Sequence, residues 1–471
     1  MELIFEKSRE GRSSAILPPC DVPVVSLPRE LTRKRPARLP NIDENSLSRH
    51  YSALESRSFG VNRGFYPLGS CTMKYNPKLG DEAAALPGFT SLHPLQEPGT
   101  LRGCLKVFDM LSRYLCPITG MDAFSFQPAA GAQGELTGLL MIKAYHESRG
   151  DAGRVNIIIP DSAHGTNPAS ASMAGFTVIN IKSGADGRMD LEALKSVTDS
   201  NTAGIMLTNP NTLGLFETGI LEITEIVHKA GGLCYYDGAN LNAIAGLFRP
   251  GDMGFDVMHI NLHKTFATPH GGGGPGSGPV GCKKILSDFL PSYGFEGDRG
   301  EGKSIGRVHG FYGNFLVAVR ALAYLLMLGR DGVADMAGNA VLNANYLLAK
   351  LKGTFPAASP GFCMHEFVLS AETLKEKYGV SALDIAKGLE DCGIHPPTVY
   401  FPLIVHEALM LEPTETESRE TLDAAADAFL SLAQKAGEDA ASLRGAPFSA
   451  AVSRPDEVKA ARQPLLRYEW K

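Results

Sequence analysis

The chain has 471 residues, of which 44% are hydrophobic and 20% are charged, and 45 Lys and Arg against 51 Asp and Glu residues give a net charge of -6. This composition is typical of a globular protein of two or three structural units with room for a large core and a buried site. The mild acidity lacks the basic surface that nucleic-acid binding requires, and we expect no membrane-spanning or exported segment. Chemistry on a small molecule in the cytoplasm is therefore the leading class of function.

The cysteine and histidine residues show no spacing that is typical of a metal site. Eight cysteines are scattered without a CxxC pair, which favours reduced thiols in a cytoplasmic compartment. The His-Glu pairs at 365–366 and 406–407 begin like the HExxH motif, but Leu369 and Met410 stand where the second histidine is needed. We interpret both pairs as surface or packing pairs and expect no metal.

Composition changes along the chain predict three regions. Residues 1–100 are rich in proline, arginine and short polar runs, and we expect an extended N-terminal arm that wraps another subunit or covers a cleft, the alternative being a loosely ordered leader. Residues 101–330 are expected to form a large domain. Residues 331–471, with Ala/Leu-rich helices between strand-like segments, are expected to form a smaller C-terminal α+β domain.

In the large domain, short β-rich runs alternate with helical stretches. The pattern predicts strands at 123–126, 155–159, 176–181, 204–207, 233–236 and 257–261, with helices that include 135–147, 191–197 and 221–229. Asp190 and Thr218 are the expected N-caps of the last two helices. Such alternation predicts an α/β fold with a mostly parallel sheet. Because ligands bind beyond the carboxyl ends of such strands, the residues that follow each strand are the candidate site.

A turn of small residues follows the first predicted strand. Residues 127–135 read QPAAGAQGE and lead into a helix, so backbone N–H groups at a helix N-terminus are available to a phosphate. Gly131 and Ala132 are the candidate contacts, because a larger side chain would hold the anion away. Taken alone, such a segment is more often a tight turn without a ligand.

Polar residues follow the later strands. His164, Asn209, Asp237 and Lys264 come after the second, fourth, fifth and sixth strands. Taken singly, a loop histidine is usually solvated, such an aspartate caps a helix or is a buried acid, and such a lysine is usually on the surface. Together they match what pyridoxal 5'-phosphate requires, namely a lysine for its aldehyde, an acid on its ring nitrogen, phosphate donors and a group against its ring. We therefore predict catalytic and cofactor-binding roles for Lys264, Asp237 and His164.

A glycine-rich run at 270–278 follows Lys264 closely. Together with the residues through Gly281, the run contains the pattern GxGxxG from Gly276 to Gly281. However, the run does not follow a strand, Pro279 lies inside the pattern, and a strand-like segment and not a helix comes next. We exclude a dinucleotide site there. We expect instead a flexible loop whose backbone can closely approach a phosphate or a neighbouring subunit.

Long stretches of the chain resemble the glycine cleavage system P-protein, the pyridoxal-phosphate enzyme glycine decarboxylase. They are YPLGSCTMKYNPK (66–78), FQPAAGAQGEL (126–136), TNPNTLGLFE (208–217), NLHKTFATPHGGGGPGSGPVG (261–281), MLEPTETES (410–418) and VKAARQPLLRYEW (458–470). The resemblance covers nearly the whole chain. The length and the LIFE start further resemble the lysine-bearing chain of the family's two-subunit form.

The resemblance implies a fold-type I pyridoxal-phosphate architecture and the decarboxylation of glycine, with transfer of the aminomethyl group to the lipoyl arm of the H-protein. It also implies a second, related chain, subunit 1, in an α2β2 heterotetramer. Two alternatives are another fold-type I decarboxylase or aminotransferase that acts on a larger amino acid, and a non-catalytic subunit that retains the cofactor. The Lys264 and Asp237 pair argues against the second alternative, because a scaffold has no need of it.

The resemblance also assigns residues to the cofactor. Because Ala130 stands where some family members have a small polar residue, backbone donors must hold the phosphate. The implied contacts are Lys264 as the Schiff-base lysine, Asp237 at the pyridine nitrogen, His164 on the ring, His263 of the HKT motif, Gly131 and Ala132 at the phosphate and, by analogy with other fold-type I enzymes, Asn209 near the ring 3'-oxygen.

Overall fold

A computed structural model describes residues 2–13, 18–35, 37–271, 276–293 and 302–470. The chain forms two compact units, one made of residues 1–63 with 447–471 and the other of residues 64–446. The domain boundaries predicted near residues 100 and 330 stay predictions.

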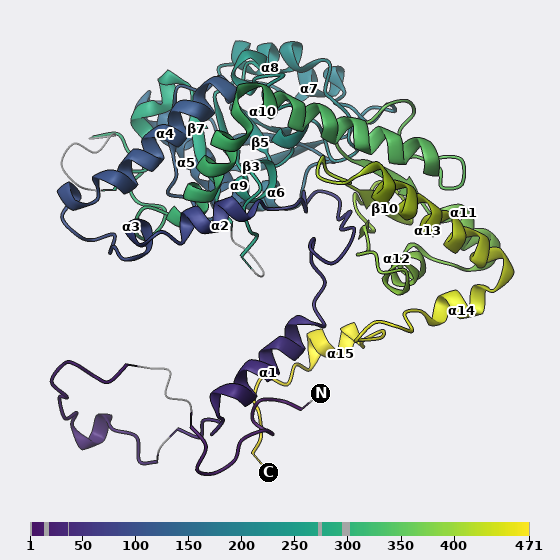
Figure 1. The fold of residues 1–471 in the computed structure, drawn as a ribbon. Coiled ribbons are helices and arrows are strands. Elements are labelled where there is room, and N and C mark those ends of the chain that lie inside the picture. The colour runs from purple at the N-terminus through teal and green to yellow at the C-terminus, as the bar shows by residue number, and fades with distance from the viewer. Residues whose placement is uncertain (1, 14–17, 36, 272–275, 294–301, 471) are drawn as a thin grey trace. The chain divides into compact units, whose positions relative to one another are not determined.

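The first unit joins the two ends of the chain (Figure 1). Phe5 stacks on Tyr468 with 4.7 Å between ring centroids, and Trp470 packs edge-on against Phe5 at 5.7 Å. Its helices are α1 (Glu44–Glu55) and α15 (Glu457–Arg462). Aromatic contacts between segments from opposite ends of the sequence therefore hold this unit together.

The second unit contains a seven-stranded sheet of order β1-β7-β6-β5-β4-β2-β3. Neighbours from β6 through to β3 run parallel, whereas β7 is antiparallel to both β6 and β1. The predicted α/β class with a mostly parallel sheet is confirmed. The strands are β1 (Ala123–Ser125), β2 (Asn156–Pro160), β3 (Thr177–Ile181), β4 (Thr202–Thr208), β5 (Leu233–Gly238), β6 (Val257–Ile260) and β7 (Val280–Cys282).

The sheet is buried on both faces. Every residue of β4 and β5 is buried, as expected for central parallel strands covered by helices on both sides. On β2, Ile158 packs into the cluster that contains Leu111 of α4 (Arg102–Thr119) and Ile223 of α8 (Ile220–Lys229). The adjacent residue Ile157 packs with Leu139 of α5 (Gly131–Ser148). This alternation places helices on both faces and leaves the carboxyl ends of the strands as the open edge.

Helices follow most strands, as the alternating pattern predicted. Besides α1 and α15, they are α2 (Lys78–Ala84), α3 (Pro87–Thr90), α4 (Arg102–Thr119), α5 (Gly131–Ser148), α6 (Thr166–Met173), α7 (Leu191–Val197), α8 (Ile220–Lys229), α9 (Leu262–Thr265), α10 (Phe315–Leu351), α11 (Glu372–Tyr378), α12 (Ala382–Asp391), α13 (Arg419–Glu438) and α14 (Ala440–Gly445). Short 3-10 helices are η1 (Arg29–Leu31), η2 (Pro98–Thr100), η3 (Leu241–Ala243), η4 (Pro250–Met253) and η5 (Lys284–Phe289).

Two helix starts were predicted from N-caps, with different outcomes. The Asp190 side chain accepts the N–H groups of Glu192 and Ala193, so the predicted cap of α7 is confirmed. The cap predicted at Thr218 is wrong, because α8 begins after Gly219 without a side-chain cap. Glycine is tolerated at the N-cap position even though it has no side chain to accept a backbone N–H.

A smaller antiparallel sheet of order β8-β10-β9 lies beyond α10, which breaks at Gly329 (φ 65°). Its strands are β8 (Phe367–Ser370), β9 (Thr398–Val399) and β10 (Ala408–Leu411). One cluster of buried residues joins this sheet to α12 and α13, including Leu409, Ile385 and Phe429. Leu68 also bridges to Leu411, so a segment from early in the chain lies beside the small sheet.

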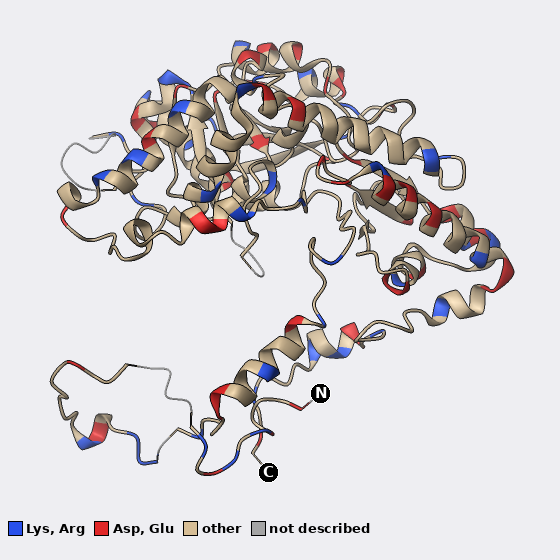
Figure 2. Ribbon diagram, viewed as in Figure 1, with Lys and Arg blue, Asp and Glu red and all other residues tan. Residues whose placement is uncertain are grey.

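The charges of the second unit are mixed. Figure 2 shows basic and acidic residues interspersed along its outer helices. In the described part of the chain, no helix combines the length and the apolar character needed to cross a bilayer.

Candidate active site

A polar cavity of about 280 Å³ lies at the carboxyl ends of β4, β5 and β6. Its volume is near the lower end of the roughly 300–1,000 Å³ that small-molecule sites usually occupy. Of the predicted cofactor residues, it is lined by Lys264, Asp237, His164, His263, Gly131 and Ala132. Asn209 does not line it.

Strand register brings the acid to this edge. Asp237 pairs with Thr208 on one neighbouring strand and with His259 on the other, so three polar residues form a row at the end of the sheet. Asp237 is only 2% exposed. Its Oδ1 accepts the N–H of Ala239 at 3.0 Å, and its Oδ2 accepts Asn167 Nδ2 at 3.1 Å. These two donors fix the direction of the carboxyl group.

His259 supports that carboxylate from the next strand. The ring is buried, which lowers its pKa and favours the neutral form. The Tyr235 hydroxyl lies 2.8 Å from Nδ1, and Nε2 lies 2.8 Å from Asn261 Oδ1 and 3.4 Å from Asp237 Oδ1. With the tyrosine as donor to Nδ1, Nε2 carries the proton and points it at both oxygens.

Lys264 lies on α9, the single turn of helix that follows β6. Its side chain is half-buried, and its Nζ donates to the carbonyl oxygen of Ser70 at 2.8 Å. Ser70 also lines the cavity. The amine is therefore held across the cavity by a loop that precedes it by 194 positions.

The turn between β1 and α5 has the form that a phosphate needs. Ala130 is the N-cap of α5 and its side chain makes no capping bond. Gly131 and Ala132 line the cavity there, at an 18-residue helix whose N-terminus favours anions. A Cβ on Gly131 would come within 2.5 Å of Asn261 Nδ2, so the close packing of this turn requires glycine.

A second observation indicates that the cavity is built for a polar ligand. The Thr208 hydroxyl is buried and lines the cavity, yet it has no hydrogen-bond partner among the described residues. Buried hydroxyls are nearly always satisfied, so this oxygen points to an external partner. With Lys264, Asp237 and the α5 N-terminus around it, the donor set fits pyridoxal phosphate.

His164 lies in a hydrogen-bonded chain at the side of the cavity. Its Nδ1 is 2.9 Å from the Thr166 hydroxyl, which in turn donates to Glu135 at 2.8 Å. Glu135 also accepts from Ser170 at 2.9 Å. Burial, followed by the charge of Asp237, raises the pKa of Glu135 to about 7. The ring of His164 remains exposed, and its predicted stacking role stays a prediction.

Asn209 is placed differently from the other predicted residues. It is fully buried, and its Oδ1 accepts the N–H of Glu217 at 2.9 Å. Its carbonyl oxygen accepts the Tyr236 hydroxyl at 2.6 Å. These contacts hold the connection after β4, while the neighbouring Thr208 faces the cavity. The geometry therefore gives no support to a role of Asn209 at the ring 3'-oxygen.

The glycine-rich run is described only in part, since residues 272–275 lie outside the described residues. A Cβ on Gly276 would meet the His263 ring at 2.2 Å, and one on Gly278 would meet the Ala130 carbonyl oxygen at 2.0 Å. The N–H of Gly278 donates to the carbonyl of Pro128 at 3.0 Å. These glycines let the chain pack against the His263 ring and against the turn between β1 and α5.

Several residues of the site had no role in the sequence-based prediction. Glu135 lies within the FQPAAGAQGEL stretch, and His259 interrupts an otherwise apolar strand, which is a signal that could have been used. Thr208 closes β4. Glu366 lies behind Ser70, whose N–H donates to its Oε2 at 2.8 Å, and no local pattern connects the two.

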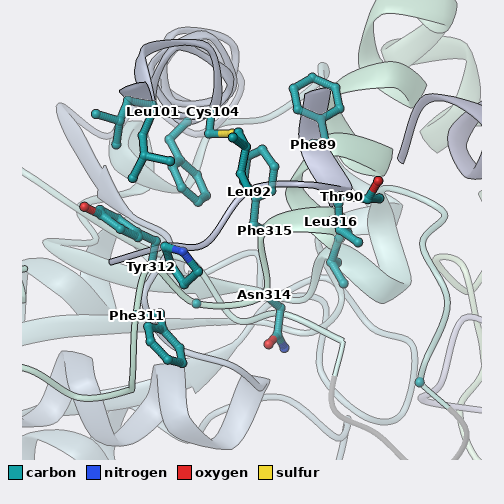
Figure 3. Close-up of a pocket in the computed structure, with 16 residues that line it drawn as sticks. Phe89, Thr90, Leu92, Leu101, Cys104, Phe311, Tyr312, Asn314, Phe315 and Leu316 are labelled. Atoms are coloured by element: carbon teal, nitrogen blue, oxygen red, sulfur yellow. The ribbon is translucent and has the colours of Figure 1, made fainter. Parts of the chain in front are cut away.

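A larger cavity of about 620 Å³ lies nearby and has a different character (Figure 3). Aromatic and aliphatic side chains line it, among them Phe89, Leu101 and Phe315. Asn314 connects the two cavities structurally, because its Nδ2 donates to the carbonyl oxygens of Ala129 at 3.1 Å and Gly276 at 2.6 Å. The groups capable of acid-base chemistry are concentrated in the smaller cavity.

Comparisons with known proteins agree with this geometry. The family profile described as "Glycine dehydrogenase, C-terminal domain" matches residues 336–444. Two relatives, both called "Probable glycine dehydrogenase (decarboxylating) subunit 2", come from Treponema denticola and Thermococcus onnurineus. The first is 59% identical, covering 99% of this chain and 98% of the relative; the second is 54% identical, covering 99% and 95%.

Solved structures show the same fold at low sequence identity. A glycine decarboxylase (P-protein) of the glycine cleavage system, in inhibitor-bound form, matches with a TM-score of 0.71 and 20% identity over 86% of this chain and 93% of that one. A NifS-like protein matches with a TM-score of 0.61 and 16% identity over 79% and 99%. These likenesses confirm the predicted fold-type I architecture.

Proposed function

The chain belongs to the family of glycine dehydrogenase (decarboxylating) subunit 2 proteins, and from this premise we propose that it decarboxylates glycine with pyridoxal 5'-phosphate and passes the aminomethyl group to a lipoyl H-protein. In the overall change, the glycine carboxylate leaves as carbon dioxide, and the aminomethyl carbon bonds to one sulfur of the lipoyl disulfide. The other sulfur becomes a thiol. When bound, pyridoxal phosphate supplies the electron sink for the bond that breaks.

The observation that carries the proposal is the placement of Lys264 and Asp237 in one polar cavity at the open edge of the sheet. Asp237 would hold a proton at the pyridine nitrogen, since its oxygens are fixed by donors and its charge is buried. Lys264 would carry the cofactor and later move protons through its amine. The N–H groups that begin α5 would hold the phosphate, and the Thr208 hydroxyl, which lies beside Asp237 in the sheet, would meet another polar atom of the cofactor.

The histidines around Lys264 and Asp237 would help to orient the cofactor. His164 would lie against the ring face, held through the Thr166 hydroxyl by Glu135. His263 would lie at the same cavity in its neutral form, because burial and the charges of His270 and Lys264 lower its pKa to about 3.

The proposal includes partners and a location. The family name of the relatives implies a subunit 1, and we propose an α2β2 assembly with subunit 1 in which active sites lie near the contact between unlike chains. A cytoplasmic location is supported by the eight cysteines, all of which are free.

A glycine-dependent exchange of labelled bicarbonate into the glycine carboxyl group tests this function. The assay compares the pure chain, the chain with subunit 1, and both with lipoyl H-protein. We expect exchange only when subunit 1 and the lipoyl protein are both present. Exchange at full rate by the isolated chain would contradict the assembly, and its absence from the complete mixture would contradict the function.

A further inference from the structure

Two glutamates and a histidine are fully buried behind the segment that contains Ser70, a residue that lines the cavity. His365 and Glu366 precede β8, Glu412 follows β10, and all three are 0% exposed. His365 Nε2 lies 3.9 Å from Glu366 Oε1 and 3.8 Å from Glu412 Oε1, too far for hydrogen bonds, and neither ring nitrogen has a partner among the described residues. Burial and the charges of Lys264 and Lys74 lower the pKa of His365 to about 3, so it adds no positive charge.

Both glutamates bind one short segment of the chain. Glu366 Oε2 accepts the N–H of Ser70 at 2.8 Å. Glu412 accepts the N–H of Thr72 at 2.9 Å and its hydroxyl at 2.5 Å. The segment thus meets a carboxyl oxygen at alternate residues, Ser70 and Thr72, from the ends of two neighbouring strands of the small sheet.

The backbone of this segment needs such support. Ser70 has φ 63° and Thr72 has φ 49°, a region that side-chain-bearing residues rarely adopt, and β-branched ones least of all. Gly69 packs so closely on Met410 that a Cβ there would come within 2.4 Å of its side chain. The conformation turns the Ser70 carbonyl toward the cavity, where it accepts the Lys264 ammonium at 2.8 Å.

Lys74 secures the other end of the segment. Its Nζ is buried and donates to Glu415 Oε1 at 2.7 Å, to Asn242 Oδ1 at 2.8 Å and to the carbonyl oxygen of Thr265 at 2.8 Å. Thr265 directly follows Lys264 on α9. The same segment is therefore bonded both to the side chain and to the neighbouring backbone of the lysine.

We propose that Glu366 and Glu412 are positioning residues, which hold Ser70–Thr72 in a strained conformation so that the Ser70 carbonyl receives the Lys264 amine whenever that amine is free of the cofactor. A free lysine ammonium in a half-buried cavity needs a hydrogen-bond acceptor, and the Ser70 carbonyl supplies one. The inference rests on the proposed function only in taking Lys264 as the lysine that carries the cofactor.

The hydrogen-bond pattern predicts a difference between the two glutamates. Glu366 accepts from two donors that cannot reverse, the Ser70 N–H and Asn240 Nδ2, which also donates to Pro210. In Glu366→Gln, the side-chain NH2 group would therefore face one of these two donors and could not accept its hydrogen. Glu412 faces one N–H and one hydroxyl, and the hydroxyl can turn to accept. Glu412→Gln should be tolerated, whereas Glu412→Ala should not.

The test measures the accessibility of the amine itself. The full-length chain, freed of pyridoxal phosphate, is pulse-labelled with acetic anhydride, and the rate at Lys264 is divided by that at the exposed Lys377. In Glu366→Gln and Glu412→Ala the Ser70 carbonyl should no longer be held in place for the Lys264 amine, and Lys264 labelling should become roughly tenfold faster. A hydrogen bond to a charged group changes an equilibrium constant by about tenfold or more, which sets this expectation. Glu412→Gln should stay within about threefold of the wild type.

Glu217→Gln is the matched control. Glu217 is also buried and accepts the backbone N–H of Met189 at 2.8 Å, but it does not line the cavity. Its variant should label Lys264 at the wild-type rate. Equal rates in Glu366→Gln and the wild type would overturn the proposal, as would equal effects of Glu412→Gln and Glu412→Ala.

If a glutamate variant fails to fold, a substitution of Thr72 tests the same contact. Thr72→Val replaces only the hydroxyl that donates to Glu412 with a methyl group and keeps the β-branched shape, and it should speed labelling by a few-fold; an unchanged rate would overturn the proposal. Because the assay uses neither glycine nor the lipoyl protein, a negative result here is separate from a negative result in the bicarbonate exchange.

Discussion

The two walls of the polar cavity are built in different ways. The strand-end wall consists of Asp237, which lies at the carboxyl end of β5, and Lys264, which lies on the short helix α9 directly after β6. The loop wall is Ser70, and its position depends on Glu366 and Glu412 from the small sheet. The first wall supplies groups that would touch the cofactor. The loop wall acts on the cofactor only through Lys264. Substitutions in the two walls should therefore have effects of different size and should change different properties of the protein.

The largest effect is expected at Lys264. Lys264→Ala should lower activity by roughly three orders of magnitude or more, because the group that carries the cofactor and moves protons is lost. The yellow colour of the wild-type protein should disappear, and borohydride should no longer fix the cofactor. Peptide mapping of the borohydride-treated wild type should find the adduct on Lys264.

Lys143→Ala is a suitable control for that experiment. Lys143 also donates its amine to a backbone carbonyl, that of Ala174 at 3.0 Å, but it does not line the cavity. Its variant should keep both colour and activity. An adduct mapped to a lysine other than Lys264 would remove the central assignment of the strand-end wall.

Asp237→Asn should have the next largest effect. The amide cannot hold a proton at the pyridine nitrogen, so activity should fall about 100-fold or more while part of the cofactor is retained. Asp256→Asn is the control, because Asp256 is a buried carboxylate at the amino end of the sheet, where it accepts the N–H of Cys234. That variant should keep its visible spectrum even if its stability falls. Near-normal turnover in Asp237→Asn would refute the role.

His164→Ala should have a smaller effect, about tenfold, on retention of the cofactor and on turnover. The ring is exposed and is held at Nδ1, by the hydroxyl and the backbone N–H of Thr166, so it can add contact area to the cofactor but little fixed charge. Equilibrium dialysis with pyridoxal phosphate measures the loss, with His228→Ala as the control on an outer helix. An unchanged spectrum and rate would mean that His164 is only a solvated loop residue.

The smallest effect concerns pH and Glu135. Its pKa is about 7 in the folded protein, against 4.5 as the ordinary value, because burial and Asp237 disfavour its charge. A carboxyl group whose pKa is raised by folding contributes its full stability below about pH 4.5 and loses it as the pH rises to about 7. Between pH 5 and 8, the wild type should therefore lose about 1–3 kcal/mol more unfolding free energy than Glu135→Gln.

Urea unfolding of both proteins at the two pH values measures this difference. Glu366 and Glu412 shift in the same direction, because burial raises the pKa of each, and they are present in both proteins. The comparison thus isolates Glu135. Parallel losses in the two proteins would show that Glu135 is ionised throughout this range.

The same comparison explains how much of the site could be predicted from sequence. Alternating strand and helix patterns predicted the parallel sheet, and the edge rule placed Asp237 and Lys264 together because each lies within four residues of a strand end. The loop wall offered no such pattern. Thr72 and Glu412 are 340 positions apart, and a buried carboxylate that accepts a backbone N–H is not visible in sequence.

Asn209 shows the limit of analogy at a strand end. Its position after β4 predicted a place in the cavity, but successive residues along a strand point to opposite faces of the sheet. Thr208 takes the inward place, and Asn209 bonds to Glu217 instead. The side of the strand, and not only its end, decides which residue meets the ligand.

The contact of Phe5 with Tyr468 and Trp470 has a practical consequence for protein engineering. Because both termini belong to one small unit, a short glycine-serine linker could join them, and new ends could be opened in an exposed loop elsewhere. The permuted chain would retain every contact of the cavity within residues 64–446. Conversely, a purification tag at either terminus alters the surroundings of both, so its placement deserves the same care as a point substitution.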